Sequence, residues 1–343
     1  MNIKLLGIDI AKNVFQLHGT DEKGKPLLKK RISREKLAEF VVNLPPCKIF
    51  MESCGGSNYW ARVFQNYGHT VKLISPQFVK PFVKTNKNDA NDAEAIVEAG
   101  SRPSMHFVPI KQIEQQDIQS LHRIRSRLIK NKTALINEIR GLNLEYGITI
   151  PLGPRQVKKR LLEIIDNKNN ELTPFSRDCM TDLYKELDDL ENRLSKIDKK
   201  VQHISKTHDL CKRILTIPGV GVLGATAIVA SVTSPNEFKN GRHLAAWLGL
   251  VPRQYSSGNK QVLLGISKRG DRYLRTLLIH GARAALTHFK NTDCAYGRWI
   301  ANQKNKLGFN KASVALANKN ARIIWSVLTS GKEFDTQYQH KAA

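Results

Sequence analysis

Apolar residues near the start of the chain come in short runs separated by polar turns, which is the pattern of strands in a sheet. Three such runs, at residues 3–10, 13–19 and 26–32, predict an antiparallel meander. The elements expected after the meander are a helix capped by Ser33, a strand, a helix and a strand, at 33–43, 47–52, 57–67 and 69–75. We therefore expect residues 1–110 to form an α/β domain.

Leucines at heptad spacing predict long helices between about residues 112 and 205. One seam follows alternating spacings of four and three: Leu183, Leu187, Leu190, Leu194, Ile197, Val201 and Ile204. An earlier helix carries leucines at intervals of seven: Leu121, Leu128, Leu135 and Leu142. The two helices could form a hairpin within one chain or pair between subunits. We assign residues 111–206 to a helical coiled-coil region.

From about residue 207 the chain is richer in glycine, alanine and other small residues. This change predicts a separate, mainly helical domain at 207–335, followed by a tail at 336–343.

Four acidic residues stand out within the predicted α/β domain. Asp9 lies inside an apolar strand, where a carboxylate is costly to bury without a partner. Glu52 ends a later strand, and alone it would be an ordinary solvated strand end. Asp89 and Asp92 share one face of a predicted helix, although they would also suit a helix N-terminus. A ribonuclease-H or Holliday-junction-resolvase fold has this order of elements and would bring all four acids together.

Carboxylates held close together repel one another unless a cation lies between them. The four acids therefore predict a divalent metal site, with two Mg²⁺ ions about 3.5 to 4 Å apart acting on a phosphodiester and Mn²⁺ as a substitute. Lys84 and Lys87, just before the acidic pair, could meet phosphate or could be solvated surface lysines.

The charge balance indicates a polyanionic partner. The chain has 55 Lys and Arg against 30 Asp and Glu, a formal net charge of +25 and a pI near 9.9. Five cysteines, odd in number and without CxxC spacing, favour a reducing cytoplasm and argue against a zinc site. The sequence has no run of about 18 apolar residues, so we expect no membrane span.

The segment 214–232 reads as two apolar helices joined by a Pro-Gly-Val-Gly turn. It resembles a helix-hairpin-helix, in which amides near Gly219 and Gly221 would hold a nucleic-acid phosphate. An ordinary turn between helices is the alternative.

Basic residues are dense between residues 239 and 275, where Asp271 is the one acid. We expect a phosphate-binding surface there, formed by Arg253, Lys260, Lys268, Arg269, Arg272 and Arg275. A Ser256-Ser257-Gly258 loop lies within it, and such a loop is by composition most often a turn.

Taken in order, these fragments resemble one family over nearly the whole chain. GIDIAKNVF, MESCGGSNYWA and NDANDAEAI are similar to the resolvase-like domain of IS110-family transposases, including the IS1111 group of Piv-like recombinases. IPGVG, LAAWLGLVP, SSG and KRGDRYLR are similar to the transposase domain of the same family.

The resemblance implies that Asp9, Glu52, Asp89 and Asp92 bind Mg²⁺. It implies that Ser257 attacks DNA to give a 5′-phosphoserine and a free 3′-hydroxyl, with Ser256 as the alternative nucleophile. It further implies dimers and tetramers that recombine donor and target double-stranded DNA under the guidance of a bridge RNA, through a Holliday junction, in the cytoplasm at the nucleoid. Candidate RNA contacts, or else a solvated helix face, are Arg123, Arg125, Arg127, Lys130 and Lys132.

Two other functions fit the residues. A hydrolytic Holliday-junction resolvase would use water as its nucleophile and the SSG loop only as structure. A non-catalytic nucleic-acid-binding protein would use the basic surface and the helical turn alone.

Overall fold

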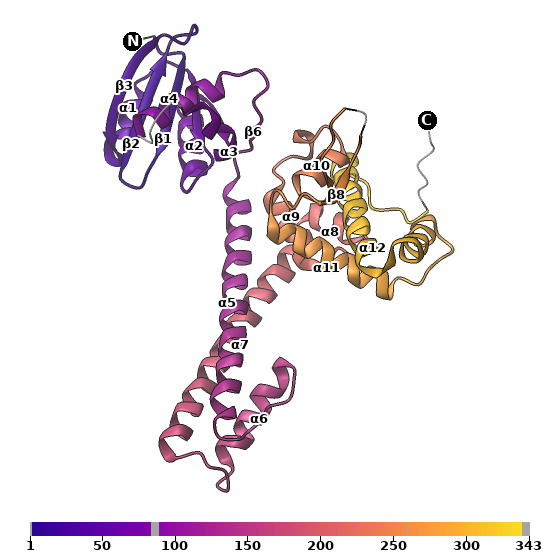
Figure 1. The fold of residues 1–343 in the computed structure, drawn as a ribbon. Coiled ribbons are helices and arrows are strands. Elements are labelled where there is room, and N and C mark those ends of the chain that lie inside the picture. The colour runs from indigo at the N-terminus through magenta and orange to yellow at the C-terminus, as the bar shows by residue number, and fades with distance from the viewer. Residues whose placement is uncertain (1, 84–88, 259, 338–343) are drawn as a thin grey trace. The chain divides into compact units, whose positions relative to one another are not determined.

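A computed structural model describes residues 2–83, 89–258 and 260–337. The chain divides into two units, Met1–Ile113 and Glu114–Ala343 (Figure 1).

The first unit is built on a six-stranded sheet. Its strands are β1 (Leu5–Ile10), β2 (Val14–Thr20), β3 (Pro26–Ser33), β4 (Lys48–Glu52), β5 (Thr70–Ile74) and β6 (Phe107–Val108). They lie in the order β3-β2-β1-β4-β5-β6. The first three form the predicted antiparallel meander, and β1, β4 and β5 run parallel. The short antiparallel strand β6 was not predicted from the sequence.

Helices cover both faces of this sheet. They are α1 (Arg34–Val42), α2 (Ser57–Asn66), α3 (Pro76–Val79), the 3₁₀ turn η1 (Lys80–Phe82) and α4 (Asp89–Gly100). Helices α1 and α2 pack on the face that contains Ile8 and Met51, whereas α4 packs on the face that contains Phe50. Ser33 takes the predicted N-cap position, but its side chain makes no capping hydrogen bond. The mixed α/β architecture is confirmed.

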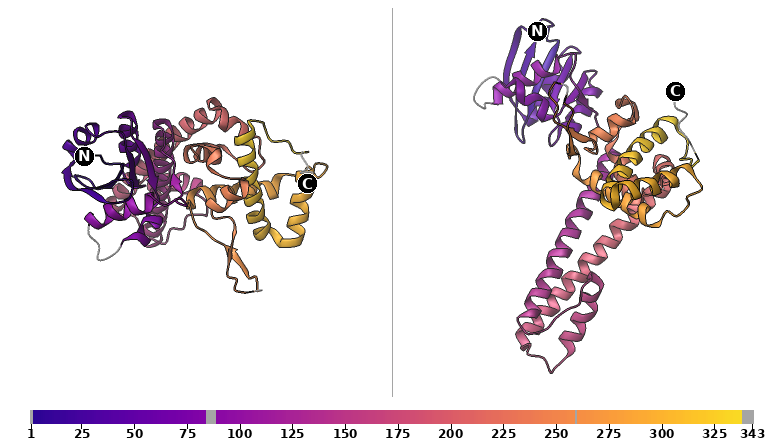
Figure 2. Two further views of the ribbon diagram at one scale, coloured as in Figure 1. Left: turned by 90° about the horizontal axis from the view of Figure 1, so that it is seen from above. Right: turned by 45° about the vertical axis from the view of Figure 1, so that its right-hand side comes forward.

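Three helices form the first part of the second unit: α5 (Ile113–Leu144), α6 (Pro154–Asp166) and α7 (Pro174–Thr207). The leucine seam of α7 packs on α5 within one chain, with Leu187 fully buried. Lys132 of α5 and Lys158 of α6 both donate to Glu191 of α7, at 2.6 and 3.1 Å. Figure 2 shows α5 and α7 side by side. Of the two arrangements that the heptads allowed, the structure therefore shows the hairpin within one chain.

The remaining elements are mainly helical. They are α8 (Asp209–Leu215), α9 (Val222–Ser231), η2 (Pro235–Glu237), α10 (Gly241–Trp247), β7 (Pro252–Gln254), β8 (Leu263–Ile266), α11 (Arg272–His288) and α12 (Ala295–Ser330). One apolar core joins these helices and includes the buried Ile228, Leu278 and Leu316. Strands β7 and β8 form a separate two-stranded hairpin.

A buried histidine fastens α5 to this helical core. His122 Nε2 lies 3.0 Å from Thr226 Oγ1 in α9, and Nδ1 lies 3.0 Å from the Tyr273 hydroxyl in α11. Since the Thr226 hydroxyl already donates to the Val222 carbonyl, Nε2 is the protonated nitrogen and Nδ1 accepts from Tyr273. Burial, with a smaller contribution from Arg125, lowers the pKa of His122 to about 4. The neutral imidazole therefore holds three helices together.

Within the described part of the chain, no helix combines the length and the apolar character needed to cross a bilayer.

Candidate active site: an acidic sheet edge and a serine hairpin

Asp9 and Glu52 lie side by side at one edge of the sheet. Strands β1 and β4 pair in parallel up to Ile8 and Met51, so Asp9 and Glu52 are the next residues in register. Both side chains are half-buried. Alternation along a strand puts them on the same face as Gly7 and Phe50. These two of the four acids are thus adjacent in the register of the sheet, and their role as metal ligands stays a prediction.

The pKa of the Cys54 thiol reflects partial burial and the negative charge of the two carboxylates. Its sulfur lies 4.0 Å from the carbonyl oxygen of Ile10. Partial burial, followed by the nearby carboxylates of Glu52 and Asp9, raises the pKa of Cys54. Both carboxylates therefore act on one small region, and Cys54 is a neighbour that the sequence pattern did not single out.

Helix α4 crosses the same face of the sheet. A side chain at Gly7 would meet the Ala93 carbonyl at 2.4 Å and Val97 at 2.6 Å, so the helix backbone lies directly over β1. Asp92, half-buried, immediately precedes Ala93. Asp89 is the first residue of the helix, but its side chain lies outside the described part, as do Lys84 and Lys87. Asp92 thus lies on the helix that covers the face of Asp9 and Glu52.

The described side chains do not by themselves complete a metal centre. Among them, no group of three or more His, Cys, Asp or Glu side chains gathers closely enough to hold an ion. The donors that are adjacent, Asp9 and Glu52, are hard carboxylate oxygens of the kind that Mg²⁺ prefers. The chemistry of this pair fits the predicted metal, while a full ligand set needs further donors from α4.

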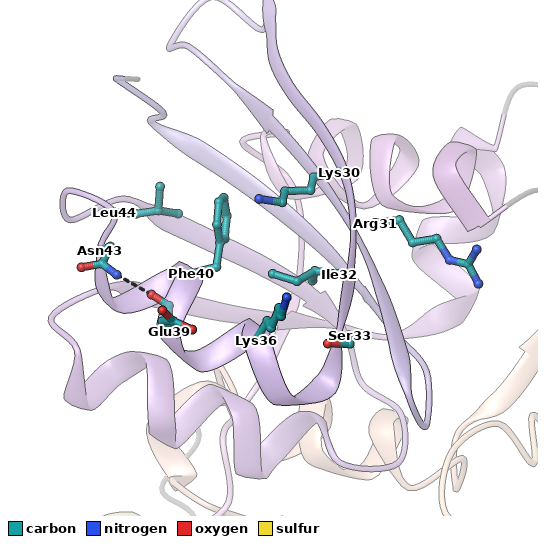
Figure 3. A pocket seen from close by; sticks show the side chains of 9 residues that line it. All are labelled: Lys30, Arg31, Ile32, Ser33, Lys36, Glu39, Phe40, Asn43 and Leu44. Carbon is teal, nitrogen blue, oxygen red and sulfur yellow. Dashed lines mark hydrogen bonds between the residues drawn. The ribbon is translucent and has the colours of Figure 1, made fainter.

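A hollow of about 680 Å³ in the first unit lies on the opposite face of the sheet (Figure 3). It is lined by β3 and α1, where the Lys30 ammonium lies 4.5 Å from the centre of the Phe40 ring. Lys30 faces Leu17 in the register of β2 and β3, on the side that α1 covers. The hollow is therefore separate from the acidic edge.

The serine loop lies at the end of the β7–β8 hairpin in the second unit. The Tyr255 amide donates to the Val262 carbonyl at 2.9 Å, and the Lys260 amide donates to the Ser257 carbonyl at 3.2 Å. Both serines, Gly258 and Lys260 are exposed. The loop is thus a turn at the end of the hairpin, as its composition predicts, and its side chains face solvent.

The two serines differ in their hydrogen bonds. The Ser256 hydroxyl accepts from the Val262 amide at 3.3 Å, across the hairpin. Within the described part of the chain, the Ser257 hydroxyl makes no hydrogen bond. Ser256 therefore has a structural use, whereas the oxygen of Ser257 is available for chemistry.

Close backbone contacts fix the base of this hairpin. The amides of Ser267 and Lys268 donate to the carbonyls of Val251 and Gly249, at 2.8 and 3.1 Å. A side chain on Gly249 would lie 2.0 Å from the Arg269 carbonyl, and one on Gly270 would lie 1.9 Å from the Trp247 carbonyl. The glycines of the LAAWLGLVP and KRGD segments thus let two turns dock directly.

The predicted basic surface divides into exposed and buried members. Exposed side chains are Arg253, Lys260, Lys268, Arg269 and Arg272. Arg275 is only 8% exposed and donates to the carbonyls of Leu248 and Arg269, at 3.1 and 3.3 Å. Arg275 therefore holds the docked turns in place, and we leave it out of the nucleic-acid surface.

The Pro-Gly-Val-Gly segment forms the turn between α8 and α9. Gly219 has a φ of +89°, and a side chain there would lie 2.7 Å from the Gly281 carbonyl, so this glycine serves packing against α11. Gly221 is the N-cap of α9 and faces open space. Of the two glycines, Gly221 is the one beside accessible helix N-terminal amides.

These features define a class of protein with an acidic ribonuclease-H-type sheet edge and a helical module bearing an exposed serine. Two family models match the chain. The DEDD transposase model of IS110 elements, described as "Transposase", matches residues 6–146. The model described as "Transposase IS116/IS110/IS902 family" matches residues 211–297.

Several known proteins are similar over almost the full chain. The transposase for insertion sequence element IS1111A of Coxiella burnetii is 50% identical over 328 residues, covering 96% of this chain and 90% of the relative. A probable family 20 transposase of Pseudomonas aeruginosa is 46% identical, covering 96% and 98%. The pilin gene-inverting protein of Moraxella bovis is 23% identical, covering 98% of both chains.

The chain belongs to the IS110/IS1111 family of insertion-sequence transposases. It is a DNA strand-transfer enzyme, as the sequence resemblance implied.

Proposed function

We propose that this transposase cuts and rejoins DNA through a covalent serine intermediate, with metal held at the acidic sheet edge. The observation that carries the proposal is the difference between the two serines: Ser256 is used by the hairpin, and the Ser257 oxygen is exposed without a partner in the described part. The adjacent carboxylates Asp9 and Glu52 supply the second component.

Asp9, Glu52, Asp89 and Asp92 would together hold two Mg²⁺ ions, or Mn²⁺ in their place. When bound, such ions neutralise the charge that develops on the scissile phosphate. The half-buried position of Asp9 and Glu52 keeps their oxygens in place beside α4, which limits the reorganisation needed during reaction. No nucleotide cofactor enters this scheme.

The serine step conserves the phosphodiester bond energy. The Ser257 Oγ attacks phosphorus, the bond to the 3′ oxygen breaks, and the hydroxyl proton ends on that departing oxygen. The products are a 5′-phosphoserine and a free 3′-hydroxyl. A 3′-hydroxyl from another strand then attacks the phosphoserine, which restores Ser257 and joins the strands through a Holliday junction.

The exposed basic residues around the hairpin support a surface for double-stranded DNA. Arg253, Lys260, Lys268, Arg269 and Arg272 are exposed cations that can neutralise backbone phosphates. Amides at Gly221 add a neutral phosphate contact in the helix-hairpin-helix manner. Lys84 and Lys87 stay proposed contacts beside the acids.

A guide RNA and an oligomer complete the proposal. On α5, Arg125 pairs with Asp198 and Lys132 pairs with Glu191, both at 2.6 Å. The exposed Arg123, Arg127 and Lys130 are therefore the stronger candidates for bridge-RNA contacts. We propose that dimers and tetramers form on the DNA. The proposed domains are a metal domain at 1–110, a helical region at 111–206, a transposase domain at 207–335 and a tail at 336–343. Because its substrate would be chromosomal DNA, we propose that transposition takes place in the cytoplasm.

The proposal predicts different outcomes for the two serines. In a reaction with donor and target DNA, Mg²⁺ and the RNA transcribed beside the gene, Ser257→Ala should abolish strand exchange, a loss of more than about 10³-fold for a missing nucleophile. Ser256→Ala should retain activity within about tenfold, because it loses one exposed hydrogen bond worth about 1 kcal/mol. Gel mobility shift should show DNA binding unchanged in both variants.

Cutting by Ser257→Ala at the wild-type rate would favour the hydrolytic resolvase instead. Full strand exchange in Ser257→Ala and in Asp9→Asn would show that neither residue takes part in catalysis. Strand exchange at the same rate without the RNA would show that no guide RNA is needed.

A further inference from the structure

Helix α12 contains a sharp reversal at Gly308. This residue has φ 71° and ψ 167°, outside the helical region, and its positive φ suits glycine. The Tyr296 hydroxyl donates to Asn320 Oδ1 at 2.9 Å, and the Lys319 ammonium lies 4.6 Å from the centre of the Trp299 ring. In a continuous helix, residues 296 and 320 would be roughly 36 Å apart at 1.5 Å per residue. The two halves therefore run antiparallel, as a helical hairpin.

The end of this hairpin consists of residues 304–311, which we call the α12 tip. It can be followed in the gold to yellow part of the ribbon in Figure 1. The exposed residues of the tip include Lys304, Asn305, Lys306, Asn310 and Lys311. These polar and charged side chains therefore face solvent at the end of the hairpin.

The whole of α12 lacks acidic residues. Over Ala295–Ser330 the sequence has no Asp or Glu, and its six basic residues are Arg298, Lys304, Lys306, Lys311, Lys319 and Arg322. A solvated helix usually intersperses charges of both signs, which support each other at spacings of three and four. The absence of acids leaves the lysines of the tip without local neutralisation, so they attract an external anion.

Arg283 of α11 is held in place beside the tip. Its guanidinium lies 4.9 Å from the centre of the Phe309 ring, and its Nη1 donates to Asn310 Oδ1 at 2.8 Å. In the described part of the chain, no carboxylate pairs with this exposed arginine. A guanidinium fixed by a ring and an amide keeps donors for phosphate and loses less rotamer freedom on binding it.

We infer that the α12 tip and Arg283 form a further binding site for duplex DNA, in which these cations contact backbone phosphates. Cations at the exposed end of such a helical hairpin can contact the phosphates of a duplex without a helix entering either groove. The site rests on the family's action on DNA and not on the serine mechanism. The tip also lies beyond residues 6–146 and 211–297, the segments that the family models match.

The experiment measures equilibrium binding only, by fluorescence anisotropy with a labelled duplex DNA over a range of KCl concentrations. The test variants are Lys306→Gln/Lys311→Gln and, separately, Arg283→Gln, in the full-length protein. The matched control is Lys23→Gln/Lys25→Gln, which removes the same charge from the exposed turn between β2 and β3. Because no cleavage is measured, failure of the serine mechanism would not affect the result.

We expect the lysine double variant to bind DNA at least about tenfold more weakly, with a log–log salt slope smaller by about 2, since each lost phosphate contact removes about 0.9. Arg283→Gln should reduce the slope by about 1. The control should stay within about twofold. Equal affinities for the double variant and its control would overturn the site, as would a loss confined to an A-form duplex RNA probe. Lys306 and Lys311 are exposed, so the double variant tests the site even where Arg283→Gln perturbs packing.

Discussion

At the level of single residues, burial decides which charged and polar groups serve packing and which remain for chemistry. Arg275 and Ser256 have the residue types of a phosphate ligand and a nucleophile, yet both are used by the protein's own backbone. Asp9 could be singled out from sequence because an acid between two isoleucines contradicts its strand. Arg275 could not be separated from its exposed neighbours, because charge density along a chain does not show depth.

His122 should make stability depend on pH. Its pKa is about 4 in the folded chain and near 6.5 when unfolded, so between these values the unfolded state binds more protons. The contribution of His122 to the free energy of unfolding, taken as the difference between wild type and His122→Gln, should therefore fall as pH drops from about 6.5 to 4, by up to about 3 kcal/mol, and stay level above pH 7. Denaturant unfolding followed by tryptophan fluorescence measures this change.

His122→Gln is the matching variant. It should unfold more easily at pH 7 by about 1 to 3 kcal/mol, because Tyr273 and Thr226 lose a well-placed partner, and it should lack the acid-dependent loss. His203→Gln, on the exposed face of α7, is the control. An identical pH dependence in wild type and His122→Gln would show that other groups cause it.

At the level of elements, hydrophobic periodicity predicted most strands and helices but left their partners open. The heptads of α7 were compatible with pairing inside one chain or between two, and the structure resolves this with a filled interior among α5, α6 and α7. Helix α6 contributes its buried Val157, Leu161 and Ile164 to this interior. The heptad seams that predicted α5 and α7 do not include this segment.

Two leucines of the heptad pattern should respond differently to truncation. Leu187 is fully buried, so Leu187→Ala should lower the free energy of unfolding by about 2 to 5 kcal/mol. Leu142 is 42% exposed, so Leu142→Ala should cost less than about 1 kcal/mol. Chemical denaturation at several protein concentrations measures both. A cost for Leu187→Ala that vanishes on dilution would show that the seam packs between subunits instead.

The ion pairs between these helices make a smaller contribution. Burial opposes ionisation of Glu191, but hydrogen bonds from Lys132 and Lys158 hold its pKa below the usual value. Glu191→Gln should therefore destabilise the hairpin by about 1 kcal/mol, less at high salt and less as pH falls below about 4.5, where the carboxylate is protonated. Glu186→Gln, an exposed change of equal charge on the same helix, should have no measurable effect on the unfolding midpoint.

At the level of the whole molecule, the two proposed catalytic components belong to different units. The carboxylates lie in Met1–Ile113 and the serine hairpin lies in Glu114–Ala343. Sequence motifs identified both components, because each depends on a local pattern of strand, turn and helix. Their proposed joint action on one phosphodiester would be a property of the assembled complex with nucleic acid, which no local pattern encodes.

The most direct measurement identifies the amino acid that becomes linked to DNA. The protein is incubated with Mg²⁺, guide RNA and a 5′-labelled donor duplex, then digested with trypsin and sequenced by tandem mass spectrometry. We predict a nucleotide 5′-phosphate on Ser257, in the peptide spanning residues 254–260. The modified peptide should be absent in Asp9→Asn and present in Glu35→Gln, an exposed acid of α1. Linkage to any other residue, or an undiminished adduct in Asp9→Asn, would contradict the joint action of metal site and serine.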